Sequence, residues 1–159
     1  MRIKGLVDED FVNYKKPSMF IIFPYCTFKC EKEAKVHCCQ NSDLAQSPNI
    51  EFGIDEIVER YINNPITSAI VCGGLEPLDS FDDLSRLLYS FRDKTENDFV
   101  IYTGYTKHEC EEKGYLTQLS NFSNVIIKFG RYIPNSKSHY DEVLGVTLNS
   151  DGQYAEKIS

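Results

Sequence analysis

Short apolar runs alternate along this chain with segments of helical periodicity, and this alternation limits the folds open to it. The apolar runs are SMFIIF at 18–23, TSAIVC at 67–72, DFVIYT at 98–103 and NVIIKF at 124–129. Runs of this kind are typical of strands buried on both faces of a sheet. Strands that alternate with helices form a mainly parallel sheet. Four or five strands are too few to close an eight-stranded barrel, so we expect an α/β fold that is an open, partial (β/α) barrel.

Three segments between these runs have features of amphipathic helices. Apolar residues recur at helical spacing over 54–62 and again over 81–91, where Ser80 is placed to cap the helix. In the third segment, Thr106 and Glu109 have the spacing of a capping box. Strand, loop and helix therefore repeat in this order along the chain.

The C-terminal segment, residues 143–158, contains an Asp-Gly pair between two strand-like runs. Asp-Gly flanked by such runs is a strong hairpin signal, so we expect a C-terminal hairpin around Asp151-Gly152. No repeat or low-complexity tract interrupts the 159 residues. We expect a single domain over residues 1–159.

Charge and hydropathy narrow the class of partner. The net charge is −7 and the pI is near 5, whereas duplex-DNA and anionic-membrane binding depends on clustered Lys and Arg. No apolar run approaches the length of a bilayer span, and the start MRIKGLVDED lacks the features of a signal peptide. We therefore expect a cytoplasmic protein that binds neither nucleic acid nor a membrane.

Four of the six cysteines lie between residues 26 and 39, directly after the first apolar run. In a reducing cytosol, clustered cysteines are more often metal ligands or catalytic groups than disulfides, and the adjacent Cys38 and Cys39 cannot bond to each other without strain. A structural zinc site needs four ligands, whereas three thiolates, from Cys26, Cys30 and Cys39, suit a [4Fe-4S] cluster with one iron left free. Both kinds of metal site remain open on spacing alone.

The sequence GGLEP, residues 73–77, follows the second apolar run. Gly73 and Gly74 have no side chains, so a ligand can approach their carbonyl groups closely, and Glu76 offers a negative charge to an ammonium group. Since ligands bind beyond the carboxyl ends of parallel strands, GGLEP and the cysteines are expected to share one rim of the sheet.

Together these motifs resemble the radical S-adenosylmethionine (SAM) enzymes, and among them the small activating enzymes of anaerobic ribonucleoside-triphosphate reductase. The family pattern is Cys-x3-Cys-x2-Cys, often followed by one residue and Asn. Cys39-Gln40-Asn41 matches that ending and Cys38-Cys39-Gln40 does not, so the resemblance assigns the third ligand to Cys39. The interval from Cys30 is six residues longer than in the family. GGLEP resembles the family's Gly-Gly-Glu motif with one residue inserted.

Three further stretches extend the resemblance over roughly residues 18 to 158, in colinear order. They are YTGYT at 102–106, GRY at 130–132 and LGVTLNSDGQY at 144–154. The resemblance implies a [4Fe-4S] cluster on Cys26, Cys30 and Cys39. It also implies SAM bound by Gly73, Gly74, Glu76 and Thr103.

The implied activity is removal of a glycine hydrogen from a large glycyl-radical enzyme, the anaerobic ribonucleotide reductase, with an electron donor such as flavodoxin. Two alternatives are a radical SAM enzyme with another peptide or small-molecule substrate, and a non-enzymatic metal-binding or electron-transfer module. A SAM-binding regulator without catalysis is a third. Lys128 is expected to face either the SAM carboxylate or solvent. Cys72 is expected in the core, Cys110 without a functional role, and the three histidines on the surface or in solvent.

Overall fold

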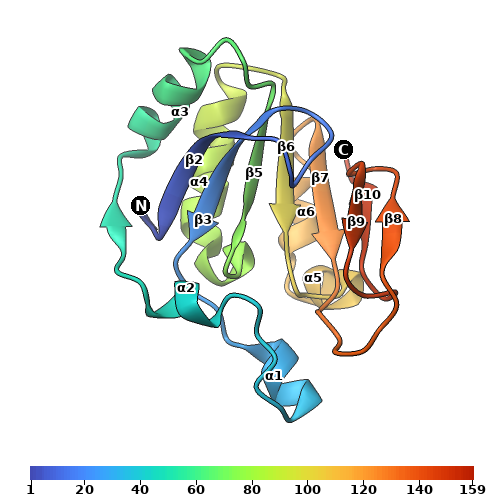
Figure 1. The fold of residues 1–159 in the computed structure, drawn as a ribbon. Coiled ribbons are helices and arrows are strands. Elements are labelled where there is room, and N and C mark those ends of the chain that lie inside the picture. The colour runs from blue at the N-terminus through green and yellow to red at the C-terminus, as the bar shows by residue number, and fades with distance from the viewer.

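A six-stranded sheet forms the centre of the computed structural model, which describes residues 1–159 (Figure 1). In sheet order the strands are β10 (Tyr154–Lys157), β7 (Val125–Phe129), β6 (Asp98–Tyr102), β5 (Ala69–Gly74), β3 (Ser18–Phe23) and β2 (Gly5–Asp10). The four inner strands are parallel, and the edge strands β2 and β10 are antiparallel to their neighbours. The sheet does not close on itself. The predicted open α/β fold with a mainly parallel sheet is therefore confirmed.

One face of the sheet packs against helices. These are α3 (Ile54–Ile62), α4 (Phe81–Arg92), α5 (Lys107–Glu112) and α6 (Tyr115–Leu119). Their apolar side chains, such as Ile57 and Leu84, share one core cluster with alternate residues of the strands, such as Ile21 and Ile101. This burial of one stripe per helix is what the apolar periodicity of the sequence predicted.

The two predicted helix starts have different outcomes. Thr106 and Glu109 form the predicted capping box at the start of α5. Ser80 precedes α4, but its side chain makes no capping hydrogen bond. The prediction for Ser80 is wrong. A short 3-10 helix, η1 (Pro77–Ser80), leads directly into α4, so Ser80 belongs to a helical turn and not to the extended backbone that usually precedes a helix.

A second, smaller core covers part of the opposite face of the sheet. Here Val71, Val100 and Ile126 of the inner strands pack against Tyr14 and Leu144. Leu144 lies between β8 (His139–Asp141) and β9 (Val146–Leu148), which pair as a separate two-stranded sheet. This core lies toward the amino ends of the parallel strands, so their carboxyl ends remain available for a site.

The C-terminal strands exist, but the hairpin predicted across Asp151-Gly152 does not form. β9 pairs with β8, whereas β10 pairs with β7. The turn therefore connects strands of two different sheets. Pairing with β10 covers the edge of β7, all five residues of which are buried.

Several short elements were not predicted. They are β1 (Arg2–Ile3), which pairs with β4 (Ile50–Glu51), the edge strand β2, the strand β8, the helix α6, and two further helices, α1 (Lys29–Ala34) and α2 (Ser42–Gln46). The helices α1 and α2 belong to the segment that follows β3, residues 24–47, which we call the cysteine segment. Figure 1 shows α1 projecting from the body of the molecule beyond the carboxyl ends of the strands. No helix in the structure has the length and apolar character to cross a membrane.

Candidate metal and cofactor site

One cavity of about 530 Å³ lies at the carboxyl ends of the parallel strands. The cysteine segment forms one wall, and the turns after β5, β6 and β7, the loop before β3 and the segment from β9 to Asn149 form the others. Of the residues predicted for the site, those that line the cavity are Cys26, Cys30, Cys39, Gly74, Glu76, Thr103 and Lys128. The structure thus brings the cysteines and the GGLEP turn to one rim. A cavity of this size can hold a small-molecule ligand.

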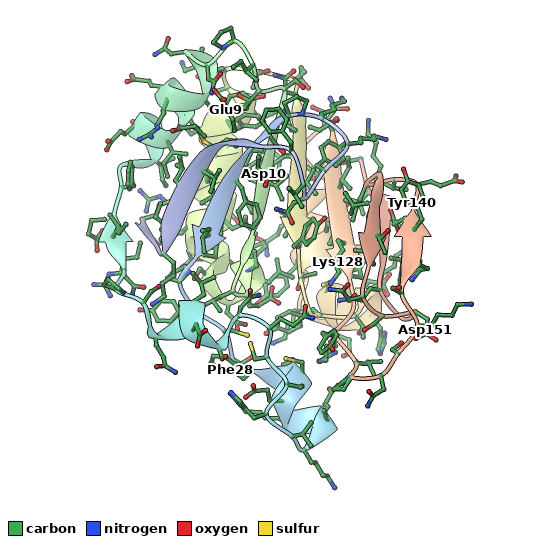
Figure 2. All side chains as sticks on the ribbon, in the orientation of Figure 1. Glu9, Asp10, Phe28, Lys128, Tyr140 and Asp151 are labelled. Carbon is green, nitrogen blue, oxygen red and sulfur yellow. The ribbon has the colours of Figure 1, made fainter.

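Three of the four clustered thiols face this cavity. Cys26, Cys30 and Cys39 are partly buried and line it, whereas the Sγ of Cys38 donates toward the carbonyl oxygen of Cys30, at 3.9 Å. Figure 2 shows sulfur atoms, in yellow, beside the start of α1 near the labelled Phe28. The ligand set that lines the cavity is therefore the one that contains Cys39.

The arrangement of the thiol groups is not that of a single-ion site. No group of three or more His, Cys, Asp or Glu side chains converges on one metal ion. A [4Fe-4S] cluster does not require such convergence, because each thiolate binds a different iron. Burial raises the pKa of Cys26 to about 11 and raises the pKa values of Cys30 and Cys39. The thiols are thus protonated at neutral pH, and iron binding must displace these protons.

Ion pairs to Arg131 hold α1 against the body of the protein. Neither α1 nor α2 contains a buried residue, so apolar packing contributes little to their position. The Arg131 side chain is only 9% exposed and reaches Glu109 of α5, at 2.6 Å, and Glu33 of α1, at 3.3 Å. Lys29 of α1 lies 3.5 Å from the same Glu109 carboxylate. Hydrogen bonding to Arg131 lowers the pKa of Glu109 to about 2.

The cysteine segment also contacts the turn after β5 at three points. The backbone N–H of Glu76 donates to the Tyr25 carbonyl at 2.7 Å, and the N–H of Thr27 donates to Asp79 at 2.8 Å. The side-chain amide of Asn41 donates to the carbonyl of Gly74 at 2.7 Å. These contacts place the cysteines opposite GGLEP.

The Glu76 carboxylate is a buried acceptor with three protein donors. Oε1 accepts hydrogen bonds from the Leu78 N–H and the Thr103 hydroxyl, and Oε2 accepts one from the Gly104 N–H. Burial raises the pKa of Glu76 to about 7, against the opposing effect of these hydrogen bonds. These three hydrogen bonds orient the Glu76 carboxylate, but no cationic side chain forms an ion pair with it.

Lys128 carries the complementary charge. The residue is 7% exposed on β7, and its ammonium group donates to one protein acceptor, the Gly130 carbonyl, at 2.8 Å. Figure 2 labels it on the face of the sheet that the helices leave open. Burial lowers the pKa of Lys128 to about 8. The structure thus places Lys128 in the cavity rather than in solvent.

The remaining predicted residues lie outside the cavity or in supporting positions. Gly73 is not part of the cavity wall, and a Cβ there would lie 3.1 Å from the Phe20 ring. Cys72 is in the core as predicted, and Cys110 is also buried. Of the histidines, His37 is exposed and pairs with Glu31.

Sequence reasoning missed two residues of the site, Asn41 and Arg131. Both stand within quoted motifs, Cys39-Gln40-Asn41 and GRY. The signal for Arg131 was its position one residue after Gly130, just beyond the end of a predicted strand, where a side chain can reach the shared rim.

Comparison with known proteins gives one match. A family model described as "4Fe-4S single cluster domain" matches residues 17–149, which include the cysteine segment and the strands β3, β5, β6 and β7. No curated protein and no solved structure matches the chain. The donor set fits this family, because three soft thiols line one cavity with space beside them.

Proposed function

The chain belongs to the 4Fe-4S single cluster domain family, and from this we propose that it is a radical SAM enzyme that activates an anaerobic ribonucleotide reductase. The observation that carries the proposal is the composition of the cavity wall. Three thiols line the same cavity as a buried carboxylate, that of Glu76, and a buried ammonium group, that of Lys128 on β7. A module that only binds metal or transfers electrons has no use for the last two groups.

The two buried charges fit the amino-acid end of SAM. An uncompensated charge in a buried site is costly, and a ligand group of opposite charge relieves that cost. Glu76 and the Gly74 carbonyl would receive the ammonium group, and Lys128 would receive the carboxylate. Thr103 would keep the Glu76 carboxylate in place through its hydroxyl, 2.8 Å from Oε1.

Cys26, Cys30 and Cys39 would hold the cluster. When both are bound, a [4Fe-4S] cluster and SAM supply one-electron cleavage of the sulfonium to methionine and a 5′-deoxyadenosyl radical. The contribution of the chain is to bind SAM by its amino-acid end, to orient the sulfonium toward the cysteine segment and to limit access of water.

The glycine hydrogen of a partner protein is the proposed target of this radical. Several residues at the cavity wall are exposed, among them Val12, at 75%, Gln40 and Asn149, so the cavity can admit a loop of another protein. The choice of an anaerobic ribonucleotide reductase rests on the resemblance of YTGYT and GRY to the activating enzymes. An electron donor such as flavodoxin would reduce the cluster.

Two measurements on anaerobically reconstituted protein test the proposal. With dithionite and SAM, the protein should release 5′-deoxyadenosine, and Cys30→Ala should not. With the anaerobic ribonucleotide reductase encoded in the same genome, it should produce a stable organic doublet in electron paramagnetic resonance (EPR). The doublet should be lost when the partner's radical-site glycine is replaced by alanine.

The outcomes separate the proposal from its alternatives. Release of 5′-deoxyadenosine without a doublet identifies a radical SAM enzyme with another peptide or small-molecule substrate. SAM binding without release of 5′-deoxyadenosine identifies a regulator. If protein with a full cluster neither binds SAM nor releases 5′-deoxyadenosine, it is a metal-binding or electron-transfer module.

A further inference from the structure

The chain between Cys30 and Cys39 has to return to the cavity over the eight residues that separate these two thiols. The helix α1 takes up the first part of this interval and ends at Lys35, whose left-handed backbone, with φ +54°, turns the chain back. Residues 35–40 make no backbone–backbone hydrogen bond, and α1 contains no buried residue. Neither regular structure nor apolar packing therefore holds Cys39 in the cavity wall.

The Glu31 carboxylate supplies a contact that holds Cys39 in place. Its Oε1 accepts a hydrogen bond from the backbone N–H of Cys39 at 2.8 Å and lies 2.8 Å from Nδ1 of His37. The Glu31 side chain is 20% exposed and that of His37 is 77% exposed, so the contact with His37 is open to water and contributes little. Because Glu31 directly follows Cys30, the bond to the Cys39 N–H closes the loop between two proposed cluster ligands.

The loop closed in this way presents one of its two adjacent thiols to the cavity. Cys39 lines the cavity, whereas the Sγ of Cys38 is directed toward the Cys30 carbonyl. After Cys39, the Asn41 side chain holds the chain to the turn after β5. We propose that Glu31 is a positioning residue that sets Cys39, and not Cys38, as the third ligand of the cluster. This inference rests on the ligand assignment within the proposed function, but it requires neither SAM nor a partner protein.

Two replacements separate the acceptor oxygen of Glu31 from its charge. Glu31→Gln keeps an acceptor for the Cys39 N–H and removes the charge, whereas Glu31→Ala removes both. A charge-assisted hydrogen bond is equivalent to about 10–100-fold in an equilibrium constant. Cluster-loaded Glu31→Ala should therefore lose iron to a chelator at least about 10-fold faster than the unchanged protein. Glu31→Gln should lose iron more slowly than Glu31→Ala.

The reduction potential of the cluster gives a readout that a merely structural role would not change. The potential of an iron–sulfur cluster depends on the charge around it, and a nearby negative charge opposes reduction. The cluster of Glu31→Gln should therefore have a higher potential than that of the unchanged protein. The matched controls are Glu112→Gln and Glu112→Ala, because Glu112 also pairs with a histidine, His108, and does not line the cavity. Both controls should keep the potential and the rate of iron loss of the unchanged protein.

The outcomes separate this inference from the ligand assignment. If Cys39→Ala abolishes the cluster but Glu31→Ala loses iron no faster than Glu112→Ala, this inference alone is overturned. An unchanged reduction potential in Glu31→Gln also overturns it, because the carboxylate would then not lie beside the cluster. If Cys39→Ala keeps the cluster, the ligand assignment and this inference both fail. In the protein without its cluster, the Cys39 amide should exchange with solvent faster in Glu31→Ala than in the unchanged protein, and equal exchange contradicts the role of Glu31.

Discussion

The Thr103 hydroxyl donates a hydrogen bond to Oε1 of Glu76, at 2.8 Å, while its oxygen accepts one from the Tyr105 N–H, at 3.0 Å. The second bond occupies a lone pair of the hydroxyl oxygen and leaves its proton for the Glu76 carboxylate, so the first helps to orient that carboxylate. Both residues are buried, Thr103 at 1% and Glu76 at 7% exposure. The pair connects the turn after β5 to the turn after β6 and presents the free lone pairs of Glu76 to the cavity.

Replacing Glu76 by glutamine should weaken SAM binding without loss of the cluster, because the proposed contact is with the ammonium group and not with iron. A charge-assisted hydrogen bond contributes about 1.5–3 kcal/mol, so affinity should fall by about one to two orders of magnitude. Calorimetry measures the affinity, and iron content measures the cluster. Equal affinity for SAM in the two proteins would rule out this role for Glu76.

The same carboxylate should make SAM affinity depend on pH. Glu76 has a pKa of about 7, and only its charged form attracts an ammonium group. Affinity should therefore rise as pH increases from 6 to 7, a range in which Lys128, with a pKa of about 8, stays mostly protonated, whereas it should stay nearly flat in Glu76→Gln. A parallel rise in both proteins would assign the pH dependence to another group.

The cysteine series tests the ligand assignment. Cys26→Ala, Cys30→Ala and Cys39→Ala should each abolish a cluster of about four irons and four sulfides per chain, as measured by iron and sulfide analysis. Cys38→Ala should retain it, since Cys38 does not line the cavity. Cys72→Ala is a control from the core. If Cys38→Ala loses the cluster and Cys39→Ala keeps it, the third ligand is Cys38.

Lys128→Met should make the ligand-free protein more stable at pH 7. The pKa of Lys128 is about 8 when folded, below the value of 10.5 for an exposed lysine, so the folded state opposes protonation. This cost is present below pH 8 and disappears as pH rises toward 10.5. Denaturant unfolding should show a gain of roughly 1–3 kcal/mol at pH 7 that shrinks by pH 10.

Lys137→Met is the matched control for this change, because Lys137 is exposed. The stability of the Lys137→Met protein should differ little from that of the unchanged protein at either pH. The Lys128→Met variant should also bind SAM more weakly, because the proposed carboxylate contact is lost. A gain in stability together with unchanged SAM affinity would show that Lys128 is a buried cation without a role in binding.

Removing the Arg131 guanidinium should loosen the cysteine segment. Arg131→Met leaves Glu33 and Glu109 without their shared partner, so amides of α1 should exchange with solvent faster than in the unchanged protein. Arg86→Met is the control, since Arg86 is 72% exposed and pairs only with Asp83 of its own helix. Equal exchange in the Arg131 and Arg86 variants would show that other contacts hold α1.

The sequence predicted the inner sheet well and its edges poorly, for a physical reason. Buried parallel strands such as β5 and β6 are continuous apolar runs, which are easy to detect. The edge strand β2, GLVDED, contains three consecutive acidic residues and has no buried residue, so its pattern resembles a loop. The Asp151-Gly152 turn was detected correctly, but a local turn signal does not determine which strands pair across it.

The candidate site, like the sheet, was predicted in part: its motifs were found from the sequence, but the contacts that hold them were not. The cysteines and GGLEP were predicted to meet because both follow strands of one parallel sheet, and that rule depends only on chain order. The contacts that hold the cysteine segment join residues far apart in sequence, as in the pair of Arg131 with Glu33. Ion pairs of this kind depend on the tertiary fold, so spacing along the chain does not indicate them.

The most direct test of the central claim is the EPR spectrum of the dithionite-reduced, cluster-loaded protein with and without SAM. If SAM binds at the iron that the three cysteines leave free, the spectrum of the reduced cluster should shift when SAM is added, and the shift should weaken in Glu76→Gln. A spectrum unchanged by saturating SAM would contradict the account, because the cluster and the Glu76 cavity would then not form one site.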